Sequence, residues 1–127
     1  MKYETKDEVL EKLCEIIMKQ EKVDDNFYDL VLERESYVQM NYGNLIAIPH
    51  PNQIASEETF AYVVILDHPI PWNGQSVQVV LLTSIGRKED KNRQRFYEAT
   101  ARFSLSKTAI EQLIQMPEYE MLINLLK

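Results

Sequence analysis

A chain of 127 residues with 45% hydrophobic and 27% charged side chains has the size and composition of one globular domain. Its single cysteine, Cys14, excludes a disulfide framework and a cysteine-based zinc cluster, and fits a reducing compartment. The formal net charge of −6 argues against direct binding of nucleic acid, because an acidic surface repels the phosphate backbone. We find neither an apolar stretch long enough for membrane insertion nor a signal peptide, and therefore expect a cytoplasmic domain.

The charges are distributed unevenly along the chain. Residues 1–40 contain eleven acidic and six basic side chains, whereas residues 84–127 contain eight basic and six acidic ones. Basic side chains of the second region gather at Arg87, Lys88, Lys91, Arg93 and Arg95. Such a cluster is either the solvated first turn of a helix or a docking surface for an acidic partner.

The first part of the chain predicts two helices. Residues 6–20 place apolar side chains at helical spacing, and Thr5 followed by Glu8 is typical of a capping box at the start of a helix. Because Cys14 lies on the apolar stripe of this helix, we expect a buried structural thiol. A second helix is predicted over residues 26–37.

The middle of the chain has the composition of strands, and the last third returns to helical spacing. Buried strands are predicted over residues 45–48, 60–66 and 77–85. The chain is expected to turn between the last two strands at Pro69, Pro71, Asn73 and Gly74. Further helices are predicted over residues 91–103, 106–115 and 118–126. Helices around several buried strands indicate the α/β class.

Motifs that usually carry chemistry are scarce. The sequence has no Gly-rich phosphate loop, no nucleophile elbow and no histidine pair at metal spacing, so we expect no metal and no cofactor. Of its two histidines, His50 directly follows a predicted strand, at the strand end where open α/β sheets bind ligands. Pro49 and Pro51 restrict the backbone on both sides of it, although a turn histidine packed at a strand end remains the alternative. His68 is expected to be a surface turn residue.

Residues 35–50 carry a recognisable motif. Its members are Glu35, Gly43, Ile46, Ala47, Ile48, Pro49 and His50. The pattern resembles the active-site signature of type-2 EIIA domains, the mannitol/fructose-class modules of the bacterial phosphoenolpyruvate-dependent sugar phosphotransferase system. Tyr42 and Pro51 depart from it, where an aliphatic and a small residue are usual. The resemblance covers essentially the whole chain and implies an α/β fold with a mixed β-sheet flanked by helices.

Other short motifs resemble one branch of that family. The proline after the histidine and residues 58–60, 69–72 and 95–98 are similar to those of EIIA-like domains in sugar-operon transcriptional activators and antiterminators. The family normally begins with an additional strand, whereas this chain enters its first helix within a few residues of Met1. We therefore expect residues 1–127 to form a single EIIA-like domain of a larger regulator, with a short free-standing protein as the alternative.

The resemblance also implies roles for individual residues. His50 would accept a phosphoryl group from phospho-HPr and pass it to a cysteine of an EIIB partner, a task that suits imidazole because it is largely unprotonated near neutral pH. We expect its second ring nitrogen to donate to a backbone carbonyl. Arg34 would bind the phosphate; the alternative is a surface ion pair with Asp29 or Glu33. Transport members usually carry another histidine near the helix predicted from Lys91, and this sequence has none there.

Three functions remain open on the sequence alone. The favoured one is a phosphorylatable module that regulates transcription of sugar-utilisation genes, which would make the chain a phosphocarrier domain rather than a stand-alone enzyme. The second is a transport EIIA component, a role that the missing histidine makes less favourable than phosphorylation itself. The third is a degenerate domain that binds partner proteins without accepting phosphate.

Overall fold

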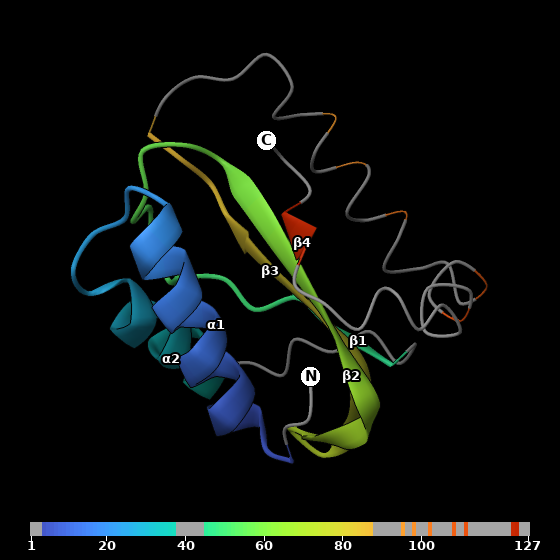
Figure 1. Cartoon of the computed structure of the whole chain (residues 1–127). Helices are drawn as coiled ribbons and strands as arrows, with labels where there is room; N and C mark the ends of the chain where they lie inside the picture. The colour runs from blue at the N-terminus through green and yellow to red at the C-terminus, as the bar shows by residue number, and fades with distance from the viewer. Residues whose placement is uncertain are drawn as a thin grey trace.

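The computed structural model describes residues 4–37, 45–87, 95, 98, 102, 108, 111 and 123–124. Its helices are α1 (Lys6–Gln20) and α2 (Phe27–Tyr37), and its strands are β1 (Ile46–Ala47), β2 (Phe60–Trp72), β3 (Gln75–Ser84) and β4 (Ile123–Asn124) (Figure 1). The element types predicted for the first 85 residues are therefore confirmed, with changes in their ends.

The predicted cap and apolar stripe both shape α1. The Thr5 hydroxyl accepts a hydrogen bond from the backbone N–H of Glu8 at 3.2 Å, which satisfies one donor at the start of the helix. The buried face consists of Val9, Leu10, Leu13, Cys14 and Ile17. Burial raises the pKa of the Cys14 thiol to about 12, which confirms the expectation of an inert structural cysteine.

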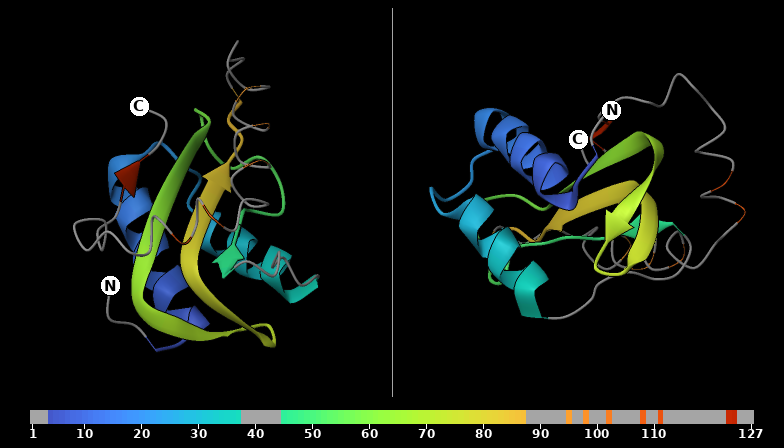
Figure 2. Two further views of the ribbon diagram at one scale, coloured as in Figure 1. Left: turned by 90° about the vertical axis from the view of Figure 1, so that its right-hand side faces the viewer. Right: turned by 90° about the horizontal axis from the view of Figure 1, so that it is seen from below.

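The four strands form one sheet in the order β1-β3-β2-β4. Strand β1 runs parallel to β3, whereas β2 is antiparallel to both β3 and β4. Both helices lie on the same side of this mixed sheet, as the two further views show (Figure 2). The main core lies between the two helices and the sheet. It includes Phe27, Leu30, Phe60, Tyr62, Trp72 and Leu82. The other face of the sheet also buries apolar side chains, namely Ile46, Ile48, Ala61, Val63, Val79 and Leu81. Burial on both faces explains the near-continuous hydrophobic runs.

The turn between β2 and β3 is shorter than predicted. Strand β2 continues through Pro69 and Pro71, and its register against β3 shifts between Ile65 and Ile70. This irregularity accommodates residues that cannot donate to a ladder, which is why proline did not end the strand. The turn itself is Asn73–Gly74, both with positive φ, of 50° and 87°. This backbone fits the tight hairpin turn for which Asn-Gly is the preferred pair.

The prediction for the end of the chain is wrong at residues 123–124. These two residues form β4, which pairs with Tyr62 and Val63 of β2, instead of the helix predicted over 118–126. Helical spacing is a local signal, and pairing with an open strand edge overrides it. In the other two predicted helices, the described residues Arg95, Glu98, Arg102, Thr108 and Glu111 are helical. The rest of both segments lies outside the described residues.

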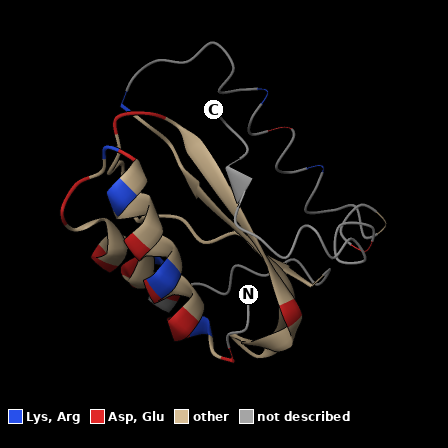
Figure 3. Ribbon diagram, in the orientation of Figure 1, with Lys and Arg blue, Asp and Glu red and all other residues tan. Residues whose placement is uncertain are grey.

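Among the residues that the structure describes, the charged ones are concentrated on the helices and connecting loops (Figure 3). Strands β2 and β3 together contain one acidic residue, Asp67, and no lysine or arginine. Within the described part of the chain, no helix is both long and apolar enough to span a bilayer. Strands β2 and β3 thus carry almost no charge, and most charged residues of the described chain lie on the helices and loops.

Candidate functional site

The segment that follows β1 holds His50 in a restricted backbone. Leu45, just before the strand, adopts a positive φ of 66°. Pro49 and Pro51 are buried on either side of the half-buried His50. The carbonyl of Pro49 accepts a hydrogen bond from the backbone N–H of Thr83 at 3.0 Å, which ties this segment to the end of β3. The histidine therefore leaves the sheet at a fixed point, as its place between two prolines predicts.

Hydrogen bonds to both ring nitrogens orient the His50 side chain. Nδ1 lies 3.2 Å from the carbonyl oxygen of Ile48, and Arg34 Nε donates to Nε2 at 3.1 Å. A carbonyl can only accept and an arginine Nε–H can only donate, so Nδ1 carries the proton and Nε2 presents its lone pair. The predicted bond from the second ring nitrogen to a backbone carbonyl is confirmed. Sequence reasoning named Arg34, and the structure brings it directly to the imidazole.

Helix α2 holds the histidine segment through a third residue that sequence analysis missed. The backbone N–H of Asn52 donates to the carbonyl of Leu30 at 3.1 Å, and its side-chain Nδ2 donates to Glu33 Oε1 at 3.2 Å. Together with the bond from Arg34, these contacts tie the His50 segment to the last turns of α2. An asparagine two residues beyond the motif gave no periodic or spacing signal that would have identified this role.

The arrangement places a nitrogen that can act as a nucleophile beside a positively charged side chain. Nε2 of His50 is the basic nitrogen of a neutral imidazole, and the half-buried Arg34 supplies a planar group with several donors next to it. A guanidinium in this place can neutralise and orient an anion that approaches Nε2. The carbonyl of Ile48, bonded to Nδ1, stabilises the positive charge that develops on the ring when Nε2 forms a bond.

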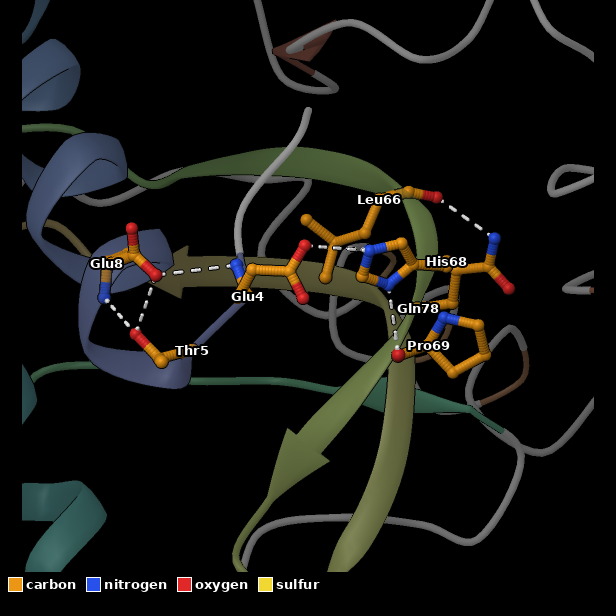
Figure 4. Close-up of polar contacts among 7 residues, drawn as sticks. All are labelled: Glu4, Thr5, Glu8, Leu66, His68, Pro69 and Gln78. Carbon is orange, nitrogen blue, oxygen red and sulfur yellow. Dashed lines mark hydrogen bonds and ion pairs between the residues drawn. The ribbon is translucent and has the colours of Figure 1, made fainter.

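His68 belongs to a different set of contacts. It is exposed, as predicted, but lies within β2 rather than in a turn. Its Nδ1 lies 3.2 Å from the carbonyl oxygen of Pro69, and its Nε2 lies 3.0 Å from Glu4 Oε1 (Figure 4). The bond to the Pro69 carbonyl, and next the bond to Glu4, raise the pKa of His68.

The predicted basic cluster is only partly described. Arg87 pairs with Asp24 at 2.6 Å and lies 3.7 Å from Glu57, so it joins the end of the β3 segment to the loop after α1. Arg95 is helical and exposed. The other three members of the cluster lie outside the described residues. No group of three or more potential metal ligands is found in the part of the chain that the structure describes.

These features define a class of α/β domain: a mixed sheet with two helices on one face and a histidine, oriented by an arginine, at the end of an edge strand of the described sheet. The model of one protein family, "Phosphoenolpyruvate-dependent sugar phosphotransferase system, EIIA 2", matches residues 1–127. The chain belongs to this family, which confirms the resemblance found in the sequence.

Two sequence relatives and one solved structure illustrate the range of similar proteins. A probable licABCH operon regulator of Bacillus subtilis is 31% identical over 116 residues, which are 91% of this chain and 18% of the regulator. A mannitol-specific phosphotransferase enzyme IIA component of Halalkalibacterium halodurans is 31% identical over 80 residues, 61% of this chain and 55% of that protein. The crystal structure of IIA mannitol from Escherichia coli superposes with a TM-score of 0.73 at 17% identity, covering 91% of this chain and 84% of the other, and confirms the fold. The aligned part of the chain thus spans 18% of the length of the operon regulator and 55% of the length of the mannitol-specific component.

Proposed function

We propose that this EIIA domain accepts a phosphoryl group on Nε2 of His50, with phospho-HPr as the donor. The observation that supports this role most directly is the pair of hydrogen bonds on the imidazole. One bond places the proton on Nδ1, and the other places Arg34 beside the lone pair of Nε2. A histidine packed merely for structure would not need its basic nitrogen aimed at a half-buried cation.

The proposed transfer needs no cofactor. Nε2 attacks the phosphorus of phospho-HPr, a nitrogen–phosphorus bond forms on His50, and the corresponding bond in the donor breaks, so that the electron pair returns to the donor imidazole. The proton of His50 stays on Nδ1, bonded to the Ile48 carbonyl. Arg34 exchanges its bond to Nε2 for bonds to the phosphoryl oxygens. Because phosphoenolpyruvate is a cytoplasmic metabolite, the reaction also implies a cytoplasmic location.

We propose a regulatory rather than a transport setting for this domain. The operon regulator aligns with 91% of the chain, while the chain covers only 18% of that regulator, so the matched part is one module of a longer protein. We propose that residues 1–127 likewise serve as one domain of a sugar-operon regulator. A regulatory domain needs to accept a phosphoryl group and change its contacts, which a new dianion achieves through charge-assisted hydrogen bonds.

A transport role is the second candidate, because the chain also aligns with a mannitol-specific IIA component. In that role His50 would pass its phosphoryl group to a cysteine of an EIIB protein. The sequence contains only two histidines, so no further imidazole is available to assist this second transfer near residue 91. The two candidates therefore share the first transfer and differ in the second.

The deciding experiment measures the intact mass of the purified chain after incubation with phosphoenolpyruvate, enzyme I and HPr. We expect the gain of one phosphoryl group that is labile in acid and stable in base. His50→Ala should abolish the gain, and His68→Ala, which removes the only other imidazole, should retain it. An unchanged mass of the native chain, under conditions that label a working EIIA domain, would refute the proposal and favour a domain that only binds partners. Transfer of the label to an added EIIB protein would support the transport role.

A further inference from the structure

The last turns of α2 determine the geometry around His50. Leu30 and Glu33 accept hydrogen bonds from Asn52, and Arg34 donates to the imidazole. All three contacts come from one face of the helix. A rotation or an axial shift of this helix end would therefore move Arg34 away from Nε2 and strain the segment that carries the histidine.

The next residue along the helix, Glu35, points into the protein. Successive residues of an α-helix are about 100° apart, so Glu35 and Arg34 face different directions. Glu35 is only 5% exposed, and its Oε1 accepts a hydrogen bond from the indole Nε1–H of Trp72 at 3.0 Å. Its second oxygen, Oε2, is buried and has no hydrogen-bond partner among the described residues. Apolar packing does not explain a carboxylate here, because burying one with an unpaired oxygen costs free energy.

The partner of Glu35 is a fixed point of the fold. Trp72 is fully buried at the end of β2 and directly precedes the Asn73–Gly74 turn. Asn73 Oδ1 also accepts a hydrogen bond at 2.9 Å from Lys6 Nζ, at the start of α1. The hairpin end is thus connected to both helices, to α1 through the part-buried side chain of Asn73 and to α2 through the buried indole of Trp72.

We infer that Glu35 is a positioning residue for phosphoryl transfer, which acts by fixing the end of α2 against the β2–β3 hairpin so that Arg34 stays aimed at Nε2 of His50. The inference rests on the proposed function. Its physical basis is directional: apolar contacts allow a helix to slide or rotate slightly, whereas the bond between the carboxylate and the indole specifies one position. Breaking that bond leaves the Glu35 side chain buried without any hydrogen bond, which opposes such movement.

The experiment compares Glu35→Leu, Glu35→Gln and Trp72→Phe in single-turnover phosphorylation, with two donors. Phospho-HPr tests the whole reaction, and phosphoramidate, a small donor that releases ammonia, tests the reactivity of His50 without any protein docking. We expect Glu35→Leu and Trp72→Phe to lower the rate constant of transfer about 10- to 100-fold with both donors, since a small misplacement of a catalytic group has effects of this size. Glu35→Gln should restore most of the rate, because an amide oxygen still accepts the indole N–H.

Two controls separate positioning from a general loss of stability. Tyr62→Phe removes a hydroxyl of the same strand β2 that lies 2.8 Å from Gln20 Oε1 and 2.7 Å from Glu21 Oε2, so it loosens the end of α1 but not α2. It should lower the melting temperature and leave the transfer rate unchanged. In an Arg34→Ala background, Glu35→Leu should have no further effect on the rate, because its influence passes through Arg34.

The outcomes distinguish the inference from the function on which it rests. Failure of the native chain to become labelled by either donor refutes the proposed function. A labelled native chain together with a normal rate in Glu35→Leu overturns the positioning role, and so does a rate loss that persists fully in the Arg34→Ala background. If Glu35→Leu does not fold, Trp72→Phe, which keeps an aromatic ring in the core, carries the same expectation and is overturned by a rate equal to that of Tyr62→Phe.

Discussion

Replacement of Arg34 by alanine tests the electrostatic part of the proposed mechanism. Its Nε donates to His50 Nε2 at 3.1 Å, so under the proposed mechanism the same group would reach a phosphoryl oxygen once Nε2 is modified. A hydrogen bond involving a charged group contributes about 1.5–3 kcal/mol, and each 1.36 kcal/mol corresponds to about tenfold in rate. We therefore expect Arg34→Ala to lower the rate constant of phosphorylation about 10- to 150-fold.

The assay is single-turnover labelling by phospho-HPr, stopped at a series of times and analysed by intact mass. Arg34→Lys keeps the charge but loses the planar fork, so it should recover only part of the rate. The matched control is Lys19→Ala, which removes one positive charge from an exposed pair with Glu15 on α1 and changes the net charge equally. A native rate in Arg34→Ala would refute the assignment of Arg34 to the phosphoryl group, and an equal loss in Lys19→Ala would show that overall charge, not position, is responsible.

Three further predictions concern the rest of the domain. Because burial raises the pKa of the Cys14 thiol to about 12, a thiol reagent at pH 8 should label the native protein only at the rate of unfolding, and rapid labelling without denaturant would contradict this. The pKa of His68 is raised in the folded protein, so protonated His68 stabilises the fold. This contribution is complete below the pKa of His68 in the unfolded chain and is lost as the pH rises through its pKa in the folded protein. His68→Gln should therefore flatten this part of a curve of unfolding free energy against pH. Gly86→Ala would bring a Cβ against the Glu58 backbone and should lower the melting temperature sharply, whereas Gly74→Ala, with open space but a φ of +87°, should cost only about 1 kcal/mol.

The parts of the site that sequence reasoning located are those encoded by neighbours in the chain. The two prolines identified the segment that holds His50, and Arg34 was named at the end of the second helix through the family resemblance. Their spatial relation is long-range and follows from the fold: α2 packs on the sheet so that its last turns reach the end of β1. The hydrogen bond from the imidazole Nδ1 to the Ile48 carbonyl is local, which is why it was predictable.

The features that sequence reasoning missed depend on contacts between distant segments. Strand β4 forms by pairing with the edge of β2 at Tyr62 and Val63, although the residues of β4 lie in a segment with helical spacing. The two prolines of β2 are tolerated because the register against β3 shifts nearby. The bond between Glu35 and Trp72 joins residues 37 positions apart, and no pattern in either segment predicts that a carboxylate would be buried against an indole.

Phosphorylation of His50 would add negative charge near an acidic side chain, because Glu33 lies within the same set of hydrogen bonds through Asn52. The first 40 residues of the sequence, which include Glu33, carry eleven acidic and six basic side chains. A dianion on Nε2 would have the Arg34 guanidinium beside it, so the modified site would draw that group toward the phosphoryl oxygens. Arg34 carries one positive charge, so part of the charge of the phosphoryl dianion would remain uncompensated at the loop that follows β1. We therefore expect a partner that distinguishes the two states to contact this loop. Substitution of Asn52 or Glu33, which lie beside it, should then change the partner's affinity for the phosphorylated domain, as measured by titration of both states.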